Sequence, residues 1–282
     1  MKVLLLVNPQ KAASQTLASE IRNELEKRGC QIHLFAYTDS SPPSADFDIA
    51  FSLGGDGTVL FAARTVAAMG IPILPLNLGT LGFIAAVHPQ EWRTVFADFL
   101  ERRVVISERI MLNVRVERAG KTVFDMAALN DAVISASGIA KTIRLEAVSR
   151  DNHLASYRSD GLIVATPTGS TAYCASAGGP ILDPEMEALI LNPICPFTLL
   201  HRPLVMPANE LITVNIEKEQ RSGVLLTIDG QVTEALESSD RVLLCKAESK
   251  ARLLASDKKA FYRALHSKLA WAPGRQPEGY YA

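Results

Sequence analysis

A carboxylate lies inside a glycine-rich turn in the first part of the chain. The segment Gly54-Gly55-Asp56-Gly57-Thr58 follows an apolar run and precedes a helical pattern. Glycines have no Cβ atom, so backbone N–H groups and a helix N-terminus can approach phosphate oxygens closely there. A carboxylate in such a cradle repels phosphate unless it binds Mg²⁺ or accepts the proton of an attacking hydroxyl. The segment therefore predicts phosphoryl transfer at Asp56, with a plain tight turn as the alternative.

This turn differs from two common nucleotide-binding motifs. It lacks the Gly-Lys-Ser/Thr ending of a P-loop, and Leu60 stands where the dinucleotide fingerprint has its third glycine. Both differences argue against a P-loop enzyme and against an ordinary dehydrogenase.

A second polar cluster extends from Asp160 to Pro180, and its residues 166–173 read TPTGSTAY. The hydroxyls and main-chain groups of such a loop can satisfy the edges of a nucleobase and a ribose, while Tyr173 offers a flat face. A structural Ser/Thr turn is the alternative that spacing alone leaves open. We expect this cluster to bind a nucleoside.

A polar pair, Asn130-Asp131, interrupts an otherwise apolar run that we interpret as a strand over residues 127–135. Polar pairs in a strand cost stability unless they are exposed at a strand end or bind a ligand. We expect the pair to bind a ribose, with a solvent-facing edge pair as the alternative.

The elements that must position these residues differ between the two halves of the chain. In the first hundred residues, short apolar runs alternate with helical patterns, which is typical of a parallel sheet flanked by helices. Strands are expected at 3–7, 32–36, 49–53 and 71–76, with a loop at 40–44, and helices are expected around Leu17, Ile21 and Leu25, around Val59, Ala63 and Val66, and around Trp92, Val95, Phe96 and Phe99. The glycine turn then joins a strand to a helix.

From about residue 110 the apolar period becomes that of strands. Alternation is clear at Leu112, Val114 and Val116 and at Ile143, Leu145 and Ala147, and further strand-like runs occupy 161–165, 211–216, 223–228 and 241–246. The sequence therefore predicts an α/β N-terminal domain with a Rossmann-like parallel sheet, residues 1–109, and a mostly-β, β-sandwich-like domain, residues 110–254. Residues 255–282 carry helical spacing from Tyr262 to Trp271, and we expect them to return to the first domain.

Composition excludes several classes of partner. The 29 basic and 30 acidic residues give a formal net charge of −1, and no long basic run could neutralise a nucleic-acid backbone or an anionic membrane. The four cysteines are far apart, so neither a zinc site nor a disulfide framework is indicated. No apolar run is long enough for a membrane span or a signal peptide. We expect a cytoplasmic enzyme with small-molecule substrates.

Together these motifs resemble those of the NAD kinases. The resemblance rests on the turn at 54–58, the run NLGTLGF at 77–83, the pair at 130–131 and the segment 160–180. The later segments TIDGQ at 227–231 and KLAW at 268–271 extend it over roughly residues 1 to 271. Diacylglycerol and sphingosine kinases and phosphofructokinases share versions of the Gly-Gly-Asp-Gly element, whereas TPTGSTAY is highly specific.

The resemblance implies transfer of a phosphoryl group from ATP, or from another phosphoryl donor such as polyphosphate, to the 2′-OH of the adenosine ribose of NAD, giving NADP, in a homodimer or homotetramer. It implies that residues 1–109 bind the phosphate donor and that residues 110–254 bind NAD. Asp56 is the expected catalytic residue and a candidate ligand for Mg²⁺ or another divalent cation. Phosphate is expected at Gly54, Gly55, Gly57 and Thr58, the nicotinamide side of NAD at Asn130, Asp131 and Asp160, its adenosine side at Phe83, Thr171, Ala172, Tyr173 and Ser176, and further NAD contacts at Gly57, Arg158 and Thr168.

Three departures from the family's pattern stand out. The family usually has Asn-Glu where this chain has Asn130-Asp131, Cys174 replaces a commoner Asn, and residues 197–203 differ from the usual lead into Arg-Pro. Two other functions remain open at this point. A lipid kinase of the diacylglycerol type predicts an apolar acyl channel, and a non-catalytic NAD-binding sensor predicts binding without product.

Overall fold

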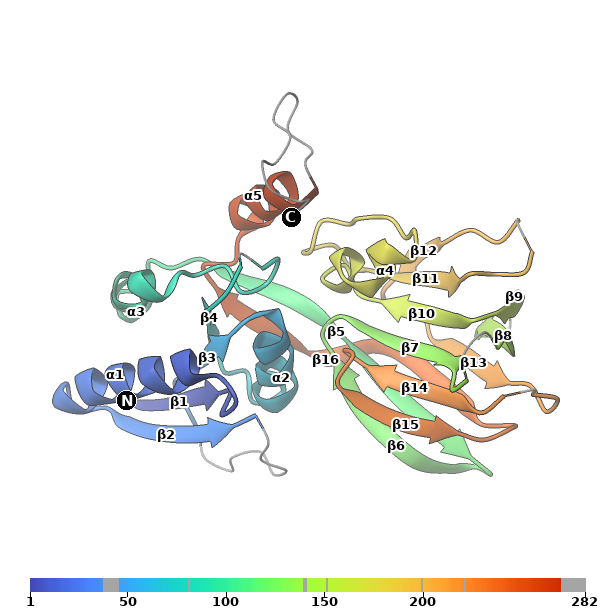
Figure 1. The fold of residues 1–282 in the computed structure, drawn as a ribbon, viewed down its shortest axis with the longest axis horizontal. Coiled ribbons are helices and arrows are strands. Elements are labelled where there is room, and N and C mark those ends of the chain that lie inside the picture. The colour runs from blue at the N-terminus through green and yellow to red at the C-terminus, as the bar shows by residue number, and fades with distance from the viewer. Residues whose placement is uncertain are drawn as a thin grey trace. The chain divides into compact units, whose positions relative to one another are not determined.

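The computed structural model describes residues 1–37, 46–80, 82–138, 141–150, 152–198, 200–220 and 222–269 (Figure 1). The expected loop at 40–44, Leu81 of the 77–83 run, Leu199 and the residues from Ala270 onward, including Trp271, lie outside the described residues. The chain forms two compact units. Unit 1 comprises Met1–Glu108 and the segment that begins at Ala251, and unit 2 comprises Arg109–Lys250.

A parallel sheet forms the centre of unit 1. Its order is β2 (Gln31–Ala36), β1 (Lys2–Val7), β3 (Ile49–Gly54) and β4 (Ile73–Asn77), followed by the end of β16 (Arg241–Leu254), where Leu253 pairs with Ile73. The central strand β3 is buried along its whole length, as expected for a parallel sheet covered on both faces.

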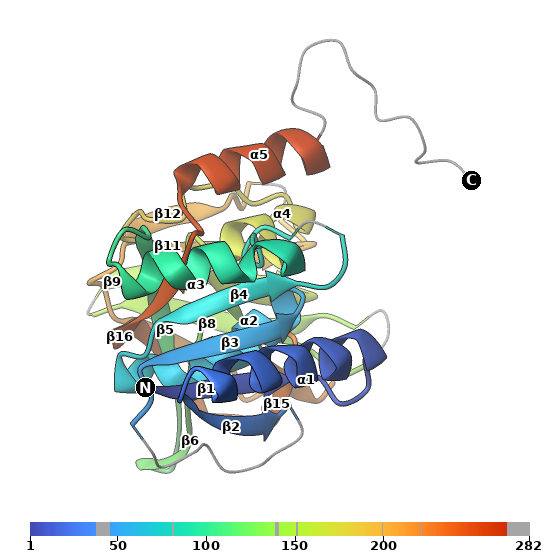
Figure 2. The same ribbon diagram turned by 90° about the vertical axis from the view of Figure 1, so that its left-hand side faces the viewer.

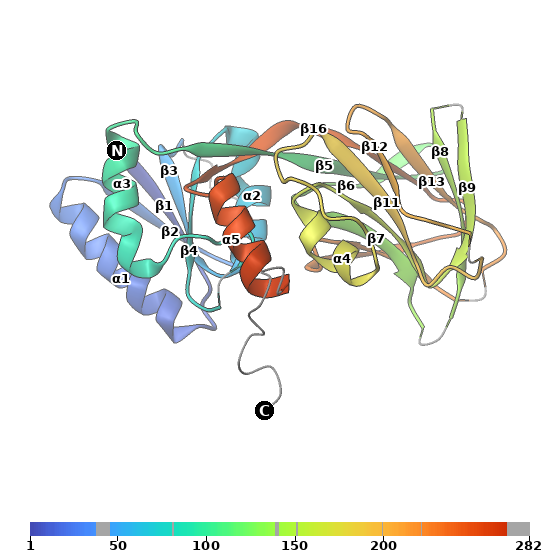
Figure 3. The same cartoon turned by 90° about the horizontal axis from the view of Figure 1, so that it is seen from above.

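Helices cover both faces of this sheet. Figures 2 and 3 show α1 and α3 on one face and α2 on the other. The helices of unit 1 are α1 (Ala12–Lys27), α2 (Asp56–Val66), α3 (Trp92–Leu100) and α5 (Lys258–Leu269), with short 3-10 turns η1 (Ala67–Met69) and η2 (Pro89–Glu91). Leu17, Ile21 and Leu25 of α1 are buried, so the helix expected from their spacing is confirmed.

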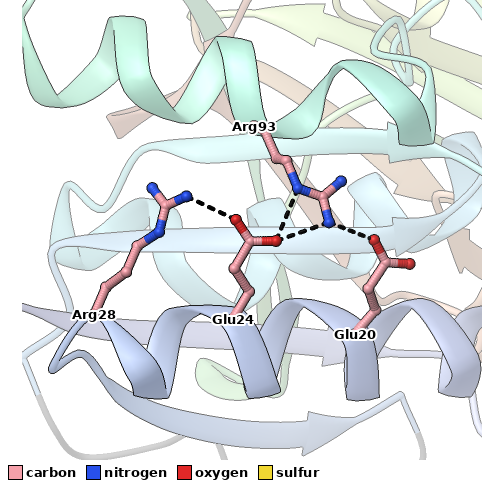
Figure 4. Close-up of polar contacts among 4 residues, drawn as sticks. All are labelled: Glu20, Glu24, Arg28 and Arg93. Atoms are coloured by element: carbon pink, nitrogen blue, oxygen red, sulfur yellow. Dashed lines mark hydrogen bonds and ion pairs between the residues drawn. The ribbon is translucent and has the colours of Figure 1, made fainter.

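A charged network joins the outer surfaces of α1 and α3 (Figure 4). Arg93 of α3 donates to Glu20 and Glu24 of α1, each at 2.8 Å, and Arg28 donates to the second oxygen of Glu24 at 2.7 Å. Exposed ion pairs of this kind are screened by solvent and contribute little to stability. The network therefore orients two helices that the apolar core already holds.

Unit 2 is built from two antiparallel layers. One layer has the order β12 (Leu204–Pro207), β11 (Ala188–Ile194), β10 (Gly161–Ala165), β7 (Asp131–Ala136), β14 (Val224–Ile228) and β15 (Val232–Leu236). The other contains β16, β13 (Ile212–Ile216), β8 (Ile143–Ser149) and β9 (Asn152–Ser159), with β5 (Ile106–Arg118) and β6 (Lys121–Ala128) paired beside β16. Apolar side chains of both layers meet in one core, for example Leu145 and Leu226. The short elements η3 (Gly169–Thr171) and α4 (Tyr173–Ser176) follow β10.

The predicted fold class, an α/β domain with a mostly-β second domain, is confirmed. Two details differ from the sequence-based expectation. Residues 127–135 are two strands rather than one, because β6 ends at Ala128 and β7 begins at Asp131, so the polar pair lies at a turn. The strand expected at 241–246 continues to Leu254. Within the described ranges, every helix is too short or too polar to cross a membrane.

Candidate active site

Asp56 is the first residue of α2, directly after the buried strand β3. Its carboxylate binds the loop that follows β4: Oδ2 accepts the N–H of Phe83 at 2.9 Å, and Oδ1 accepts those of Ile84 at 3.2 Å and Ala85 at 2.8 Å. The loop comes this close because residue 82 is glycine, where a Cβ would collide with the carboxylate. Three main-chain N–H groups therefore fix the orientation of the Asp56 carboxylate.

The glycine turn beside Asp56 lines a small cavity of about 190 Å³ in unit 1, together with two residues from other strand ends and the N-cap of α1. Asn8 follows β1, Tyr37 follows β2 and Gly55 follows β3, so the cavity lies at the carboxyl ends of three neighbouring parallel strands. Ligands of open α/β sheets bind at this edge. The remaining lining residues are Lys11, Gly57 and Thr58.

The electrostatics of this cavity favour an anion. Lys11 is the N-cap of α1 and Gly55 is the N-cap of α2, so two helices begin at the cavity. Each helix N-terminus carries a partial positive charge, and the lysine adds a full one. Our sequence reasoning missed Asn8, Lys11 and Tyr37, although the positions of Asn8 and Tyr37 just after predicted parallel strands were an available signal.

A larger cavity of about 410 Å³ lies in unit 2. It brings together four of the residues expected to bind NAD, Asn130, Asp131, Ala172 and Tyr173, which come from segments about 40 positions apart. The half-exposed ring of Tyr173 is available for stacking, with 48% of its surface accessible. The other lining residues are Val133, Ser135, Thr227, Asp229 and Gly230, which the sequence reasoning did not assign.

Main-chain contacts join these two segments. Thr166 donates its N–H to the carbonyl of Asn130 at 2.8 Å and its hydroxyl to the carbonyl of Leu129 at 2.5 Å. Gly169 lies so close to Asn130 that a Cβ would collide with the main chain there. The TPTGSTAY loop is therefore packed directly on the turn that carries the polar pair.

Buried polar side chains form part of the wall of this cavity. Asn130 and Asp131 are buried, with 8% and 4% of their surfaces exposed, so the alternative of a solvent-facing edge pair is wrong. Burial raises the pKa of Asp131 to about 7, and the nearby charge of Asp229 adds to the shift. Oδ1 of Asn130 has no hydrogen-bond partner within the described part of the chain, and neither has Oγ1 of Thr168, which does not line the cavity. Such groups favour a ligand that presents hydroxyl or amide donors.

Other residues expected to bind NAD do not line this cavity. Thr171 and Ser176 flank the Ala172-Tyr173 pair on the same loop. Arg158 is on β9, where its guanidinium stacks 4.7 Å from the ring of Phe197, and Asp160 is exposed between β9 and β10. In unit 1, the ring of Phe83 contacts Phe261 and Lys268 of α5.

The described residues include no group of three or more His, Cys, Asp or Glu side chains that could hold a metal ion. Asp56 still fits one metal contact, because its Oδ2 accepts a single hydrogen bond and keeps a lone pair. Mg²⁺ in kinases is usually held by one or two carboxylates together with substrate phosphates.

Comparison with known proteins identifies the family. The ATP-NAD kinase N-terminal domain matches residues 38–104, and the ATP-NAD kinase C-terminal domain matches residues 129–256. This chain belongs to the NAD kinase family. The NAD kinase of Treponema denticola is 39% identical over 280 residues, covering 98% of this chain and 99% of that protein. The NAD kinase of Treponema pallidum is 40% identical over 274 residues, covering 96% of this chain and 90% of that protein.

Solved structures agree with this membership. An NAD kinase from Archaeoglobus fulgidus in complex with ATP superposes with a TM-score of 0.76 at 25% identity, covering 96% of this chain and 99% of that one. Yeast NADH kinase complexed with NADH shares the fold, with a TM-score of 0.86 at 22% identity, covering 99% of this chain and 90% of that one. The prediction of an NAD kinase is thus confirmed, and neither the lipid kinase nor the sensor gains support.

Proposed function

We propose that this NAD kinase transfers the terminal phosphoryl group of ATP to the 2′-OH of the adenosine ribose of NAD, giving NADP. The observation that carries the mechanism is the position of Asp56 at the start of α2, next to a cavity that favours phosphate. Unit 1 is proposed to hold the phosphate donor and unit 2 to hold NAD.

The donor phosphates are proposed to bind in the cavity of unit 1. The N–H groups at Gly55 and Gly57, the Thr58 hydroxyl and the Lys11 ammonium group are suitable donors to phosphate oxygens. Gly54 supports the turn, because a Cβ there would collide with Thr58. A divalent cation that neutralises charge on the transferred group would be held by the donor phosphates, because the free lone pair on Oδ2 of Asp56 is proposed to take the proton.

Asp56 is proposed to act as the general base. The O2′–H bond breaks and its proton moves to Oδ2 of Asp56, the ribose oxygen forms a bond to the terminal phosphorus, and the bond from that phosphorus to the leaving ADP breaks. The N–H groups of Phe83, Ile84 and Ala85 fix the carboxylate before the reaction, so little reorganisation is needed during it.

The NAD contacts are proposed to include the acceptor-rich wall of unit 2. Oδ1 of Asn130, the Asp131 carboxylate and Oγ1 of Thr168 would accept hydrogen bonds from ribose hydroxyls or the amide, and the Tyr173 ring would stack on a base. Asp131 is one methylene shorter than the family's usual Glu and reaches less far. Gly57, Phe83, Arg158, Asp160, Thr171, Ala172 and Ser176 complete the proposed set.

Assembly and location are part of the same proposal. We expect a homodimer or homotetramer in the cytoplasm, with no nucleic-acid or membrane partner, and sedimentation of the purified protein measures its assembly. A monomer at micromolar concentration would contradict this part alone.

A coupled assay tests the reaction. Purified protein receives NAD, ATP and Mg²⁺, and NADP is detected with an NADP-specific dehydrogenase. We expect NADP from the wild type and almost none from Asp56→Asn. Asp98→Asn makes the same chemical change on the exposed surface of α3, where Asp98 pairs with Arg103, and should retain normal activity. NADP formation from polyphosphate but not from ATP would identify polyphosphate as the phosphoryl donor. Binding of NAD without product would favour a sensor, and phosphorylation of diacylglycerol a lipid kinase.

A further inference from the structure

Asp229 occupies a tight turn that nothing in the proposed reaction yet uses. The N–H of Gln231 donates to the carbonyl of Ile228 at 2.9 Å, and Asp229 and Gly230 have φ angles of 51° and 66°. These values describe a type I′ turn between β14 and β15. Asp, Asn and Gly are the residues that adopt this left-handed conformation most readily.

The Asp229 side chain binds a segment about a hundred residues earlier in the sequence. Its Oδ1 accepts the N–H of Asn130 at 2.7 Å and that of Asp131 at 3.2 Å, and its Oδ2 accepts the N–H of Leu129 at 3.1 Å. The contact is reciprocal, since the Asp229 N–H donates to the carbonyl of Asp131 at 3.0 Å. All four residues are buried.

This arrangement holds the turn between β6 and β7 from two sides. Asp229 satisfies its N–H groups, whereas Thr166 satisfies the carbonyls of Leu129 and Asn130. Without the carboxylate, three neighbouring N–H groups in a buried turn would lose their acceptor, and the turn would rearrange or admit water. The side chains of Asn130 and Asp131 would then leave their positions in the cavity wall.

The carboxylate at this position carries an electrostatic cost. Asp229 is buried beside Asp131, and two like charges in one buried site repel each other. A neutral Asn would avoid that repulsion but would offer one acceptor oxygen in place of two, so it could not hold all three N–H groups. The Asp229 carboxylate also lines the cavity itself, so it gives the wall a negative character that suits hydroxyl and amide donors.

We propose that Asp229 is the positioning residue of the NAD site: its carboxylate fixes the turn at 129–131 and thereby holds Asn130 and Asp131 against the substrate. This inference rests on the proposed function, specifically on NAD occupying the cavity of unit 2. It assigns a role to the TIDGQ segment, which the sequence resemblance singled out without one.

The charge of Asp229 also sets where Asp131 titrates. The titratable groups coupled to Asp131 are Asp229 from the β14–β15 turn and the Cys174 thiol from α4. Removing the charge of Asp229 lowers the pKa of Asp131, because one of the two causes of its rise disappears. If Asp131 accepts a hydrogen bond from NAD, its protonation weakens binding, so the KM for NAD rises toward acidic pH.

Two variants keep the turn and change the carboxylate. Asp229→Gly retains a residue suited to positive φ but removes all three acceptor contacts, and Asp229→Asn retains the shape but removes the charge and one acceptor oxygen. We expect the KM for NAD to rise roughly 10- to 100-fold in Asp229→Gly and about tenfold in Asp229→Asn. The KM for ATP should stay within about twofold of the wild type, since the donor cavity is in unit 1.

A matched control separates positioning from general stability. Asp240 is another buried carboxylate of unit 2, which accepts hydrogen bonds from Arg118 at 2.9 and 2.8 Å and from the N–H of Glu237 at 2.8 Å, away from the cavity. Asp240→Asn should lower the melting temperature and leave the KM for NAD within about twofold. The pH profile is the second readout: the acidic rise in the KM for NAD should move to lower pH in Asp229→Asn.

The outcomes separate the positioning role of Asp229 from the proposed binding of NAD in the cavity of unit 2. Three results would overturn the positioning role. In a folded Asp229→Gly protein, these are an unchanged KM for NAD, or a KM for ATP that rises as much as the KM for NAD. In Asp229→Asn, it is a pH profile of the KM for NAD that does not shift. Binding of NAD that is insensitive to Asp131→Ala shows instead that NAD does not use this cavity, and the proposed function of unit 2 fails. If both Asp131→Ala and Asp229→Gly weaken NAD binding, the result supports the positioning role of Asp229 and the binding of NAD in this cavity.

Discussion

The carboxylate of Asp56 accepts a 2.8 Å hydrogen bond from the main-chain N–H of Ala85, which ties the start of α2 to the loop after β4. Two further N–H groups complete the contact. The charge that we propose for catalysis and the local structure therefore depend on the same side chain, and substitutions near Asp56 should affect both.

Replacing Asp56 by Asn removes the base and turns one oxygen into an amide donor that faces an N–H group. We expect kcat to fall by about 10² to 10⁴, equivalent to roughly 3 to 5.5 kcal/mol of barrier. Steady-state kinetics measures the loss, and circular dichroism checks that the variant is folded. Near-normal turnover in a folded Asp56→Asn protein would rule out the base role.

A pair of glycine substitutions tests whether the loop contact matters for the rate. In Gly82→Ala the new methyl group would collide with the Asp56 carboxylate, so we expect kcat to fall at least roughly tenfold and stability to fall by about 1 to 3 kcal/mol. Gly79→Ala changes the same loop where the nearest atom is 3.9 Å away, and should be nearly neutral. Equal effects of the two variants would contradict the proposed contact.

Lys11 should affect the binding of the phosphoryl donor, ATP, and not the binding of the phosphoryl acceptor, NAD. Lys11→Met removes the full positive charge from the cavity of unit 1, and we expect the KM for ATP to rise roughly tenfold while the KM for NAD changes little. Lys27→Met, in the last turn of the same helix, serves as the control. A rise in the KM for NAD alone would place the phosphates elsewhere.

Asp131 should make stability depend on pH. Its pKa in the folded protein is about 7 against an ordinary value of 3.8, so the folded state binds the proton more tightly, and this contribution to stability is lost as the pH rises from about 4 to about 7. The full loss is at most about 4 kcal/mol. Asp131→Asn lacks the buried charge. Between pH 5 and pH 8, urea unfolding should therefore show the free energy of unfolding of Asp131→Asn increasing relative to that of the wild type. A constant difference across that range would show that Asp131 titrates normally.

Much of this architecture could be predicted from the sequence because its signals are local. Apolar spacing gave the helices of unit 1, and the order of apolar run, glycines and helix placed Asp56 at a strand-helix junction. The turn at Leu129 and Asn130 was missed, because the polar pair that interrupts the apolar run does not by itself show that the chain passes there from one sheet to the other. The contact between Asp229 and residues 129–131 was also beyond reach, since nothing in either segment alone indicates a partner about a hundred positions away.

The path of the chain through the two units has a consequence for biosynthesis. The chain leaves unit 1 after Glu108 and returns to it at Ala251, within β16, whose Leu253 pairs with Ile73 of β4. During synthesis on the ribosome, the Ile73 end of β4 therefore lacks its partner strand until all of unit 2 has been made, whereas the Leu76 end already pairs with Val87 of unit 1. Exposed edges promote mispairing with other chains. The nascent protein thus depends on unit 2 folding promptly, so that β16 can close the first sheet.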